Sequence, residues 1–230
     1  MSGIFYTQRL AMTSRMGMAE HKAEVYIPEL QIFANILLSH YRTTTPNNFN
    51  PRQESWAEAF IVTPQTPPVP LTGGMGPAFL QRDPTVYLKT DQLTFYLQVS
   101  NGGGGLPGNP NLEASASAVC VIYDYSPSPT LDMASVVQQL DLAVYAEDGT
   151  VVATHQSVRL AGGREFDEDE TRERVLAEAY AMRERKQGSL RVATLGYGQM
   201  PVHTDFRVDP STGQAEPLSG QASGENLVRP

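Results

Sequence analysis

The chain has 230 residues, enough for one large domain or two small ones with a hydrophobic core. Its formal net charge of −8 at pH 7 argues against a protein that binds nucleic acid directly and against attachment to an anionic membrane. No apolar run reaches roughly 18 residues, so we expect no transmembrane helix. No apolar signal segment follows the first residues, so we expect no secretion. The single cysteine, Cys120, excludes an internal disulfide and a cysteine-rich metal site, and its apolar neighbours indicate a buried side chain.

Residues 1–23 are predicted to form an N-terminal arm. Half of the eight methionines of the chain lie in its first 18 residues, without a convincing period. Methionine adapts to irregular apolar surfaces and is frequent at interfaces. We therefore expect this arm to dock on another surface through Met12, Met16 and Met18, with a flexible terminus as the alternative.

Residues 24–42 are predicted to form a helix. Pro28 suits the first helical turn. An apolar stripe follows at helical spacing, consisting of Leu30, Phe33, Leu37 and Tyr41. A strand is the alternative, because isoleucine and phenylalanine are frequent in this segment.

Residues 43–84 are predicted to be a proline-rich extended segment. Eight of the 17 prolines fall here, and proline is excluded from helix and sheet interiors. Only the stretch from Trp56 to Val62 has the pattern of a structured element. An unstructured segment of this length is uncommon within a compact domain. We expect it to be disordered or to lie along a surface, with Trp56, Phe60 and Phe79 as candidate contact residues.

A β-rich core is predicted over residues 85–208. Its centre is a hairpin over residues 140–160, in which alternating apolar residues precede Glu147-Asp148-Gly149, a strong turn signal. Further strands are expected over residues 85–99, with a break at 89–91 as an option, over 116–125 and over 190–195. The apolar run 118–123 suits a strand that is buried on both faces.

The clearest helix is predicted over residues 167–187. Asp167 suits the N-cap, and Glu170 stands three residues later as in a capping box. Acids in the first turn and bases in the last turn suit the helix dipole, and Gly188 suits the position after the helix. Its apolar stripe is narrow, so we expect the helix to pack on one side only.

These elements predict an α+β, mainly β fold. We expect an antiparallel sandwich or barrel-like sheet with one or two helices and long extended arms. Residues 209–230 are predicted to be a C-terminal polar tail, because they are rich in glycine, serine and proline and lack a period.

A glycine-rich stretch has the spacing of a nucleotide-binding motif. The segment from Gly103 to Gly108 satisfies G-x-G-x-x-G, but Pro107 and Pro110 exclude the helix that must open at such a motif. We interpret residues 101–111 as a loop and predict no cofactor.

His203 and Asp205 are the residues closest to a catalytic or metal-binding pattern. A metal site needs three or four converging ligands, whereas the other three histidines are scattered along the chain. The acidic run 165–170 lacks the alternating ligands of a calcium loop. We therefore predict surface or capping roles, with no catalytic residue and no metal ligand.

The functional hypothesis follows from the segments that cannot order themselves: residues 1–22, 43–84, 101–111 and 209–230. Ordering a backbone costs about 1 to 2 kcal/mol per residue, which neighbouring subunits could supply through contacts. We therefore expect a non-enzymatic structural subunit of a large symmetric assembly. A virus or phage particle component, such as a capsid-stabilising, neck or tail protein, is the leading interpretation, with copies of itself and other structural proteins as partners.

Three alternatives remain open. A carbohydrate- or ligand-binding β module would use the aromatic residues between Tyr87 and Tyr96. An accessory subunit of a large cellular complex would resemble the first interpretation. An enzyme would depend on His203 and Asp205.

Overall fold

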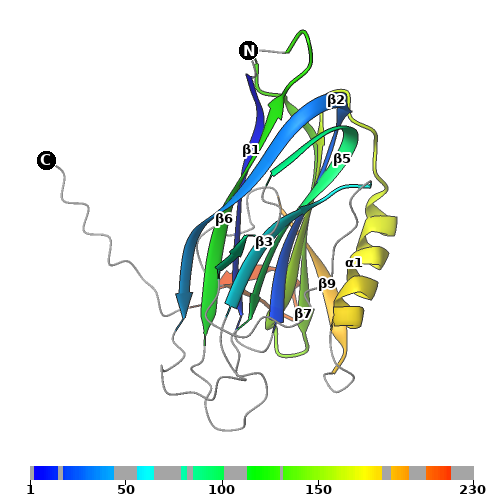
Figure 1. Cartoon of the computed structure of the whole chain (residues 1–230). Coiled ribbons are helices and arrows are strands. Elements are labelled where there is room, and N and C mark those ends of the chain that lie inside the picture. The colour runs from blue at the N-terminus through cyan, green and yellow to red at the C-terminus, as the bar shows by residue number, and fades with distance from the viewer. Residues whose placement is uncertain are drawn as a thin grey trace, which may run out of the picture.

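The computed structural model describes residues 3–14, 18–43, 56–64, 79–81, 85–100, 113–129, 132–182, 188–196 and 206–218. The fold is mainly β with one helix in these residues, as predicted (Figure 1). The strands are β1 (Gly3–Ser14), β2 (Met18–Thr43), β3 (Trp56–Val62), β4 (Phe79–Gln81), β5 (Thr85–Ser100), β6 (Ala114–Asp124), β7 (Val136–Ala146), β8 (Val151–Leu160), β9 (Leu190–Leu195), β10 (Phe206–Val208) and β11 (Ala215–Pro217). The helix is α1 (Glu168–Met182).

Strand β2 organises the sheet. Its first part, residues 18–26, lies between β5 and β8, whereas its last part, residues 32–43, pairs with β6. The change of neighbour coincides with a register shift between Tyr26 and Leu30, where Pro28 supplies no backbone donor. At the same level in β5, the hydroxyl of Thr90 accepts a hydrogen bond from the backbone N–H of Gln92 at 3.2 Å.

The two parts of the sheet pack on each other around one large core. The row β4-β3-β5-β2-β8-β7-β9 forms one part, and β1 pairs with β6 in the other. Leu10 of β1, Ile36 of β2, Phe95 of β5 and Ile122 of β6 are fully buried in this core. A second cluster lies where α1 covers β7 and β8, and it includes Leu142. The arrangement agrees with the predicted sandwich or barrel-like sheet.

The predicted helix over residues 24–42 is wrong, because these residues belong to β2. Buried and partly exposed residues alternate from Ile32 to Leu37, which is the period of a strand. The helical stripe in the sequence arose because apolar residues occupy both faces of this strand. Pairing with β5 and β6 on its two edges then satisfies the backbone as a strand.

The predicted N-terminal arm is also corrected. Residues 3–14 form β1, which pairs with β6 along its whole length. Leu10 and Met12 are buried in the chain's own core, and the ring of His21 contacts the carbonyl of Ala11. Alternation of buried residues such as Leu10, Met12 and Ser14 was the missed signal.

Most other predicted elements are confirmed. The hairpin over 140–160 is β7 and β8, and Gly149 adopts a φ of 84° in its turn. Strands β3, β5, β6 and β9 lie where strands or a structured element were expected. Two strand pairs, β2 with β8 and β3 with β4, are parallel, so the sheet is mixed and not purely antiparallel.

Helix α1 begins as predicted. Oδ1 of Asp167 accepts hydrogen bonds from the backbone of Asp169 and Glu170, both at 2.9 Å, which confirms the N-cap. The described helix ends at Met182, so the predicted extension to residue 187 lies outside the described residues.

The predicted polar tail is wrong for residues 209–218. Residues 206–218 form a small hairpin of β10 and β11, anchored to the turn before β8 by a bridge between Thr150 and Arg207. Oδ1 of Asp209 accepts hydrogen bonds from Ser211, which closes the hairpin turn. Residues 219–230 lie outside the described residues, as do 44–55, 65–78, 82–84 and 101–112.

Candidate functional site

We call the outward side of β5, β2, β6 and β1 the outer face; it is apolar at one end and carries hydroxyl groups such as those of Ser39 and Ser117 at the other. One row of cross-strand neighbours joins Tyr87, Phe33, Tyr123 and Ile4 across the four strands. The next rows contain Val121 beside Asn35, then Val119 beside Leu37.

The outer face is open to solvent. Ile4 is 47% exposed, Leu37 51% and Tyr87 59%, although these are large apolar side chains. The ring of Tyr87 meets that of Tyr125, itself 52% exposed, edge to face at 5.1 Å. Phe33 and Tyr123 approach within 5.7 Å beside them. Contiguous apolar patches of this kind mark interaction surfaces more often than isolated exposed residues do.

Strand β6 explains why the outer face stands out. Its residues 118–123 are all apolar and were predicted to be buried on both faces. In the structure Ala118, Cys120 and Ile122 are buried, whereas Val119, Val121 and Tyr123 are only partly covered. The prediction is therefore wrong for this chain by itself. A strand that is apolar on both faces is typical of one that is covered on both sides.

The charges at the outer face have one sign. The outer face consists of residues 4–13 of β1, 115–123 of β6, 33–42 of β2 and 85–89 of β5. Among these residues, no outward position holds an acid. The basic residues at its margin are exposed: Arg9, His40, Arg42 and Lys89. Lys89 also contacts Glu29, at 3.2 Å. A basic margin is unusual on a chain of net charge −8.

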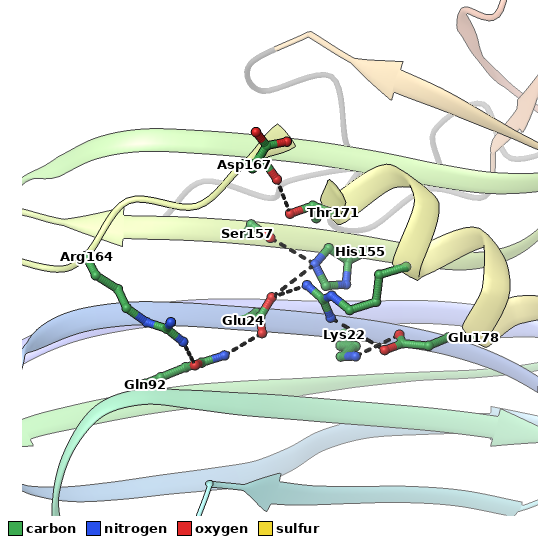
Figure 2. A network of polar contacts seen from close by, with 10 residues as sticks. Lys22, Glu24, Gln92, His155, Ser157, Arg164, Asp167, Thr171 and Glu178 are labelled. Carbon is green, nitrogen blue, oxygen red and sulfur yellow. Dashed lines mark hydrogen bonds and ion pairs between the residues drawn. The ribbon is translucent and has the colours of Figure 1, made fainter. Parts of the chain in front are cut away.

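A second feature, the charged layer, lies between α1 and the sheet (Figure 2). Glu20, Lys22 and Glu24 alternate along β2 and face α1, and all three are buried. Lys22 Nζ lies 2.8 Å from Glu178 Oε2, and Arg174 Nη2 lies 2.6 Å from Glu24 Oε2. Two side chains of the helix are thus paired with two side chains of one strand.

Other polar groups complete the charged layer around Glu24. Gln92 of β5 donates a hydrogen bond to its Oε1 at 2.5 Å, and Arg164 in turn contacts Gln92 (Figure 2). The guanidinium of Arg164 also lies over the ring of Tyr26, which stacks on Phe166. Burial, reinforced by Glu24, raises the pKa of Tyr26. These contacts join the segment before α1 to the sheet.

Two buried histidines lie on opposite faces of the sheet. Burial lowers the pKa of His21 to about 4, and its Nδ1 donates to the carbonyl of Ala11. Burial also lowers the pKa of His155, and the charges of Lys22 and Arg174 act in the same direction. His155 is therefore neutral near pH 7, so its 3.7 Å contact with Glu24 is not an ion pair.

His155, Ser157 and Glu24 have the residue types of a catalytic triad but not its geometry. Both Ser157 Oγ and Glu24 Oε2 approach the same ring nitrogen, Nε2, at 2.9 and 3.7 Å. A triad requires the acid at Nδ1 and the nucleophile at Nε2. Ser157 is also fully buried, so a substrate could not reach it. This cluster holds α1 on the sheet and does not form a nucleophilic site.

The candidate contact residues from the sequence fall in different places. Met12 lies in the chain's own core, 3.9 Å from the hydroxyl of Thr154, so its side chain is not on the surface. Met18 is 38% exposed and shares a row with Ser100 and Trp56. Phe60 stacks on Tyr96 at 4.8 Å. Met16 lies outside the described residues, as does the side chain of Phe79.

The remaining residues that the sequence analysis considered for catalysis or ligand binding lie outside the described residues or are buried. The motif over 103–108, His203 and Asp205 lie outside the described residues. Cys120 is buried, as expected, and burial raises the pKa of its thiol. Among the described residues, no three His, Cys, Asp or Glu side chains converge as a metal site would require. The described part of the chain contains no helix that is long and apolar enough to span a membrane.

Comparison with known proteins finds no matching family model, no matching curated protein and no matching solved structure.

Proposed function

We propose that this chain is a non-enzymatic structural subunit of a large symmetric assembly, with a virus or phage particle as the leading case. The observation that supports this most is the outer face. Residues 118–123 of β6 are apolar on both sides, but their own chain covers the side of Val119, Val121 and Tyr123 only in part. A neighbouring subunit would cover that side and remove Leu37, Tyr87 and Ile4 from water.

The proposal no longer depends on an N-terminal arm. Deleting residues 1–22 would remove β1 and the start of β2 from the core, so the loss of assembly would not be informative. The outer face offers a cleaner test, because its side chains can be changed without opening the core.

The test is the mass of the purified chain, measured by light scattering over a range of concentrations. We expect the mass to rise above the 25.2 kDa of one chain as concentration increases. The variant Leu37→Lys with Tyr87→Lys should stay at the mass of one chain. Val137→Lys is the matched control, because Val137 is 53% exposed but lies in β7, away from the outer face. A wild-type chain that stays monomeric at every concentration would contradict the proposal.

A carbohydrate- or ligand-binding module is the second candidate, and one observation favours it. Tyr87 and Tyr125 present an exposed pair of rings, which offer apolar faces with a polar tip. Binding to a glycan array that is lost in Tyr87→Ala would support this candidate. Binding that survives in Tyr87→Ala would place the glycan site away from this pair of rings, and no binding at all would leave only the structural proposal.

A further inference from the structure

The outward side of α1 carries acids, whereas the margin of the outer face carries bases. Thr171, Val175 and Ala179 face the sheet and are buried. Asp169, Glu170 and Glu173 lie on the opposite side in the first half of the helix, and all are exposed. Arg172 pairs with Asp169 at 2.5 Å, but no described base contacts the side chain of Glu170 or Glu173.

The second half of this helix side is apolar. Ala177, Tyr180 and Ala181 follow at helical spacing and are exposed, Tyr180 to 46%. The hydroxyl of Tyr180 is held by the backbone of Leu190, at 2.8 Å from its nitrogen, so the ring is fixed in place. We call the six residues Asp169, Glu170, Glu173, Ala177, Tyr180 and Ala181 the outward stripe of α1.

The two surfaces complement each other in charge. The outward positions of the outer face hold bases and no acid, and at its margin the acid Glu29 pairs with Lys89. The outward stripe instead combines acids with small apolar side chains and an aromatic ring. Two outer faces packed against each other would bring the exposed Arg42 near its own copy, which costs free energy. Charge therefore favours the contact of an outer face with an outward stripe.

The two surfaces also match in size. A helix of 15 residues is about 22 Å long and about 10 Å wide. The outer face extends over roughly 30 Å along β2 from residue 33 to 42. It is about 14 Å wide where β5 takes part, up to residue 35 of β2, and about 10 Å wide beyond it, at ordinary strand spacing. One helix can therefore lie on the outer face without reaching beyond it.

The positions of the two surfaces favour a head-to-tail contact over a closed pair. In Figure 1, α1 lies at one side of the molecule, and β6 with the last part of β2 lies at the other. A copy that covers its neighbour's outer face with α1 still presents its own outer face to a third copy. Contacts of this head-to-tail type produce rings or open arrays.

We propose that the outer face of each copy is covered by the outward stripe of α1 from the next copy, so that the chain assembles head to tail with itself. This inference rests on the proposed structural function and specifies its partner and geometry. Because the margin contacts are between charges, raising the salt concentration should weaken the association.

The test uses two variants, each with one of the two surfaces disabled. The first, Leu37→Asp with Tyr87→Asp, places acids on the outer face, where they would repel the stripe. The second, Glu173→Lys with Ala177→Lys, places bases on the stripe, and lysine keeps good helix propensity at these exposed positions. Circular dichroism and thermal unfolding would establish that both variants fold like the wild type.

Each variant alone should have the mass of one chain, whereas the wild type should grow with concentration. An equimolar mixture should form a 1:1 complex of about twice 25.2 kDa and no larger species. This result is expected because the first variant keeps an intact stripe and the second keeps an intact outer face. The complex stops at two chains, since both remaining surfaces are disabled.

Three results would overturn the inference. The stripe variant associating by itself would mean that outer faces meet each other or that another surface is used. If the outer-face variant associates like the wild type, the interface lies elsewhere. If the mixture stays monomeric, the outer face and the outward stripe do not bind each other. In each case growth of the wild type would leave the structural function standing. A wild type that never associates would contradict both.

Discussion

Arg174 of α1 and Glu24 of β2 form an ion pair with an Nη2–Oε2 distance of 2.6 Å, although 150 positions separate them in the chain. Glu24 is 7% exposed and also accepts a hydrogen bond from Gln92. This pair, together with Lys22 and Glu178, fixes the side of α1 that faces the sheet and thereby the side that faces away.

Replacement of Arg174 by methionine should lower the free energy of unfolding by about 2 kcal/mol. The change leaves the buried carboxylate of Glu24 with only neutral partners. The loss stays below that of a fully buried pair, because the side chain of Arg174 is 35% exposed. Chemical denaturation measures it. Adding Glu24→Gln to Arg174→Met should recover part of the lost free energy of unfolding. If the double variant instead loses the sum of the two single losses, Arg174 and Glu24 are not coupled.

The two buried histidines predict a stability that decreases toward acid. The unfolded chain binds a proton at His21 near pH 6.5, whereas the folded chain binds it only near pH 4. Stability is therefore complete above pH 6.5 and decreases by about 3 kcal/mol from His21 alone as the pH falls to 4. His155 acts in the same direction. Burial raises the pKa of Glu20 and Asp141, which adds stability at low pH and opposes this trend.

Comparison with His21→Asn isolates the contribution of His21. Asparagine can donate a hydrogen bond to Ala11 but does not titrate. Its unfolding free energy should change less between pH 6.5 and 4 than that of the wild type, as measured by denaturation at each pH. His40→Asn is the control, because His40 is exposed. Equal pH dependence in His21→Asn and the wild type would be inconsistent with a buried neutral His21.

Gly149→Ala should destabilise the hairpin of β7 and β8 by more than 2 kcal/mol. Gly149 has a φ of 84°, and an added Cβ would lie 2.3 Å from the carbonyl oxygen of Val208. Gly213→Ala is the matched control, since φ is 71° there but no atom lies within 4 Å of the added Cβ. It should cost only about 1 kcal/mol of backbone strain. Equal losses in thermal or chemical unfolding would mean that the contact with Val208 is absent.

Replacement by asparagine should affect two neighbouring residues of β2 differently, Ile36 through monomer stability and Leu37 through self-association. Ile36 is fully buried, so Ile36→Asn should cost at least about 3 kcal/mol through a lost apolar contact and a buried amide. Leu37 is 51% exposed, so Leu37→Asn should change monomer stability by less than about 0.5 kcal/mol and weaken self-association. Unfolding curves and light scattering separate the two effects. A strong destabilisation by Leu37→Asn would show that this side of β2 is covered within the monomer.

Asp167→Ala should lower the free energy of unfolding by about 1 kcal/mol, because the backbone donors of Asp169 and Glu170 lose their acceptor. The control is Glu168→Ala, since among the described residues Glu168 makes a long surface contact with Arg172 alone, at 3.5 Å. Helical circular dichroism during unfolding measures both variants. A loss no larger than that of the control would contradict the capping role.

Local signals identified part of the fold. The Asp148-Gly149 turn, the N-cap at Asp167 and the β-branched residues of β8 depend on neighbouring residues, so the sequence was sufficient to predict them. Strand β2 was predicted to be a helix because its apolar residues on two faces also fit a helical spacing. Its edges are satisfied by β5, β6 and β8, which are distant in sequence.

The candidate site was harder to predict. Methionine content drew attention to the first residues, but Met12 proved to be a core residue. The outer face appears only when the register aligns Phe33 with both Tyr87 and Tyr123. The available signal was that residues 118–123 of β6 are apolar at odd and even positions alike. The charged layer had no local signal, because Glu24 and Arg174 meet only through tertiary packing.

The most direct test of the account is light scattering on the equimolar mixture of the outer-face variant and the stripe variant. The account predicts two single chains that, once mixed, form a complex of twice the chain mass. A mixture that keeps the mass of a single chain, while the wild type associates under the same conditions, would contradict it.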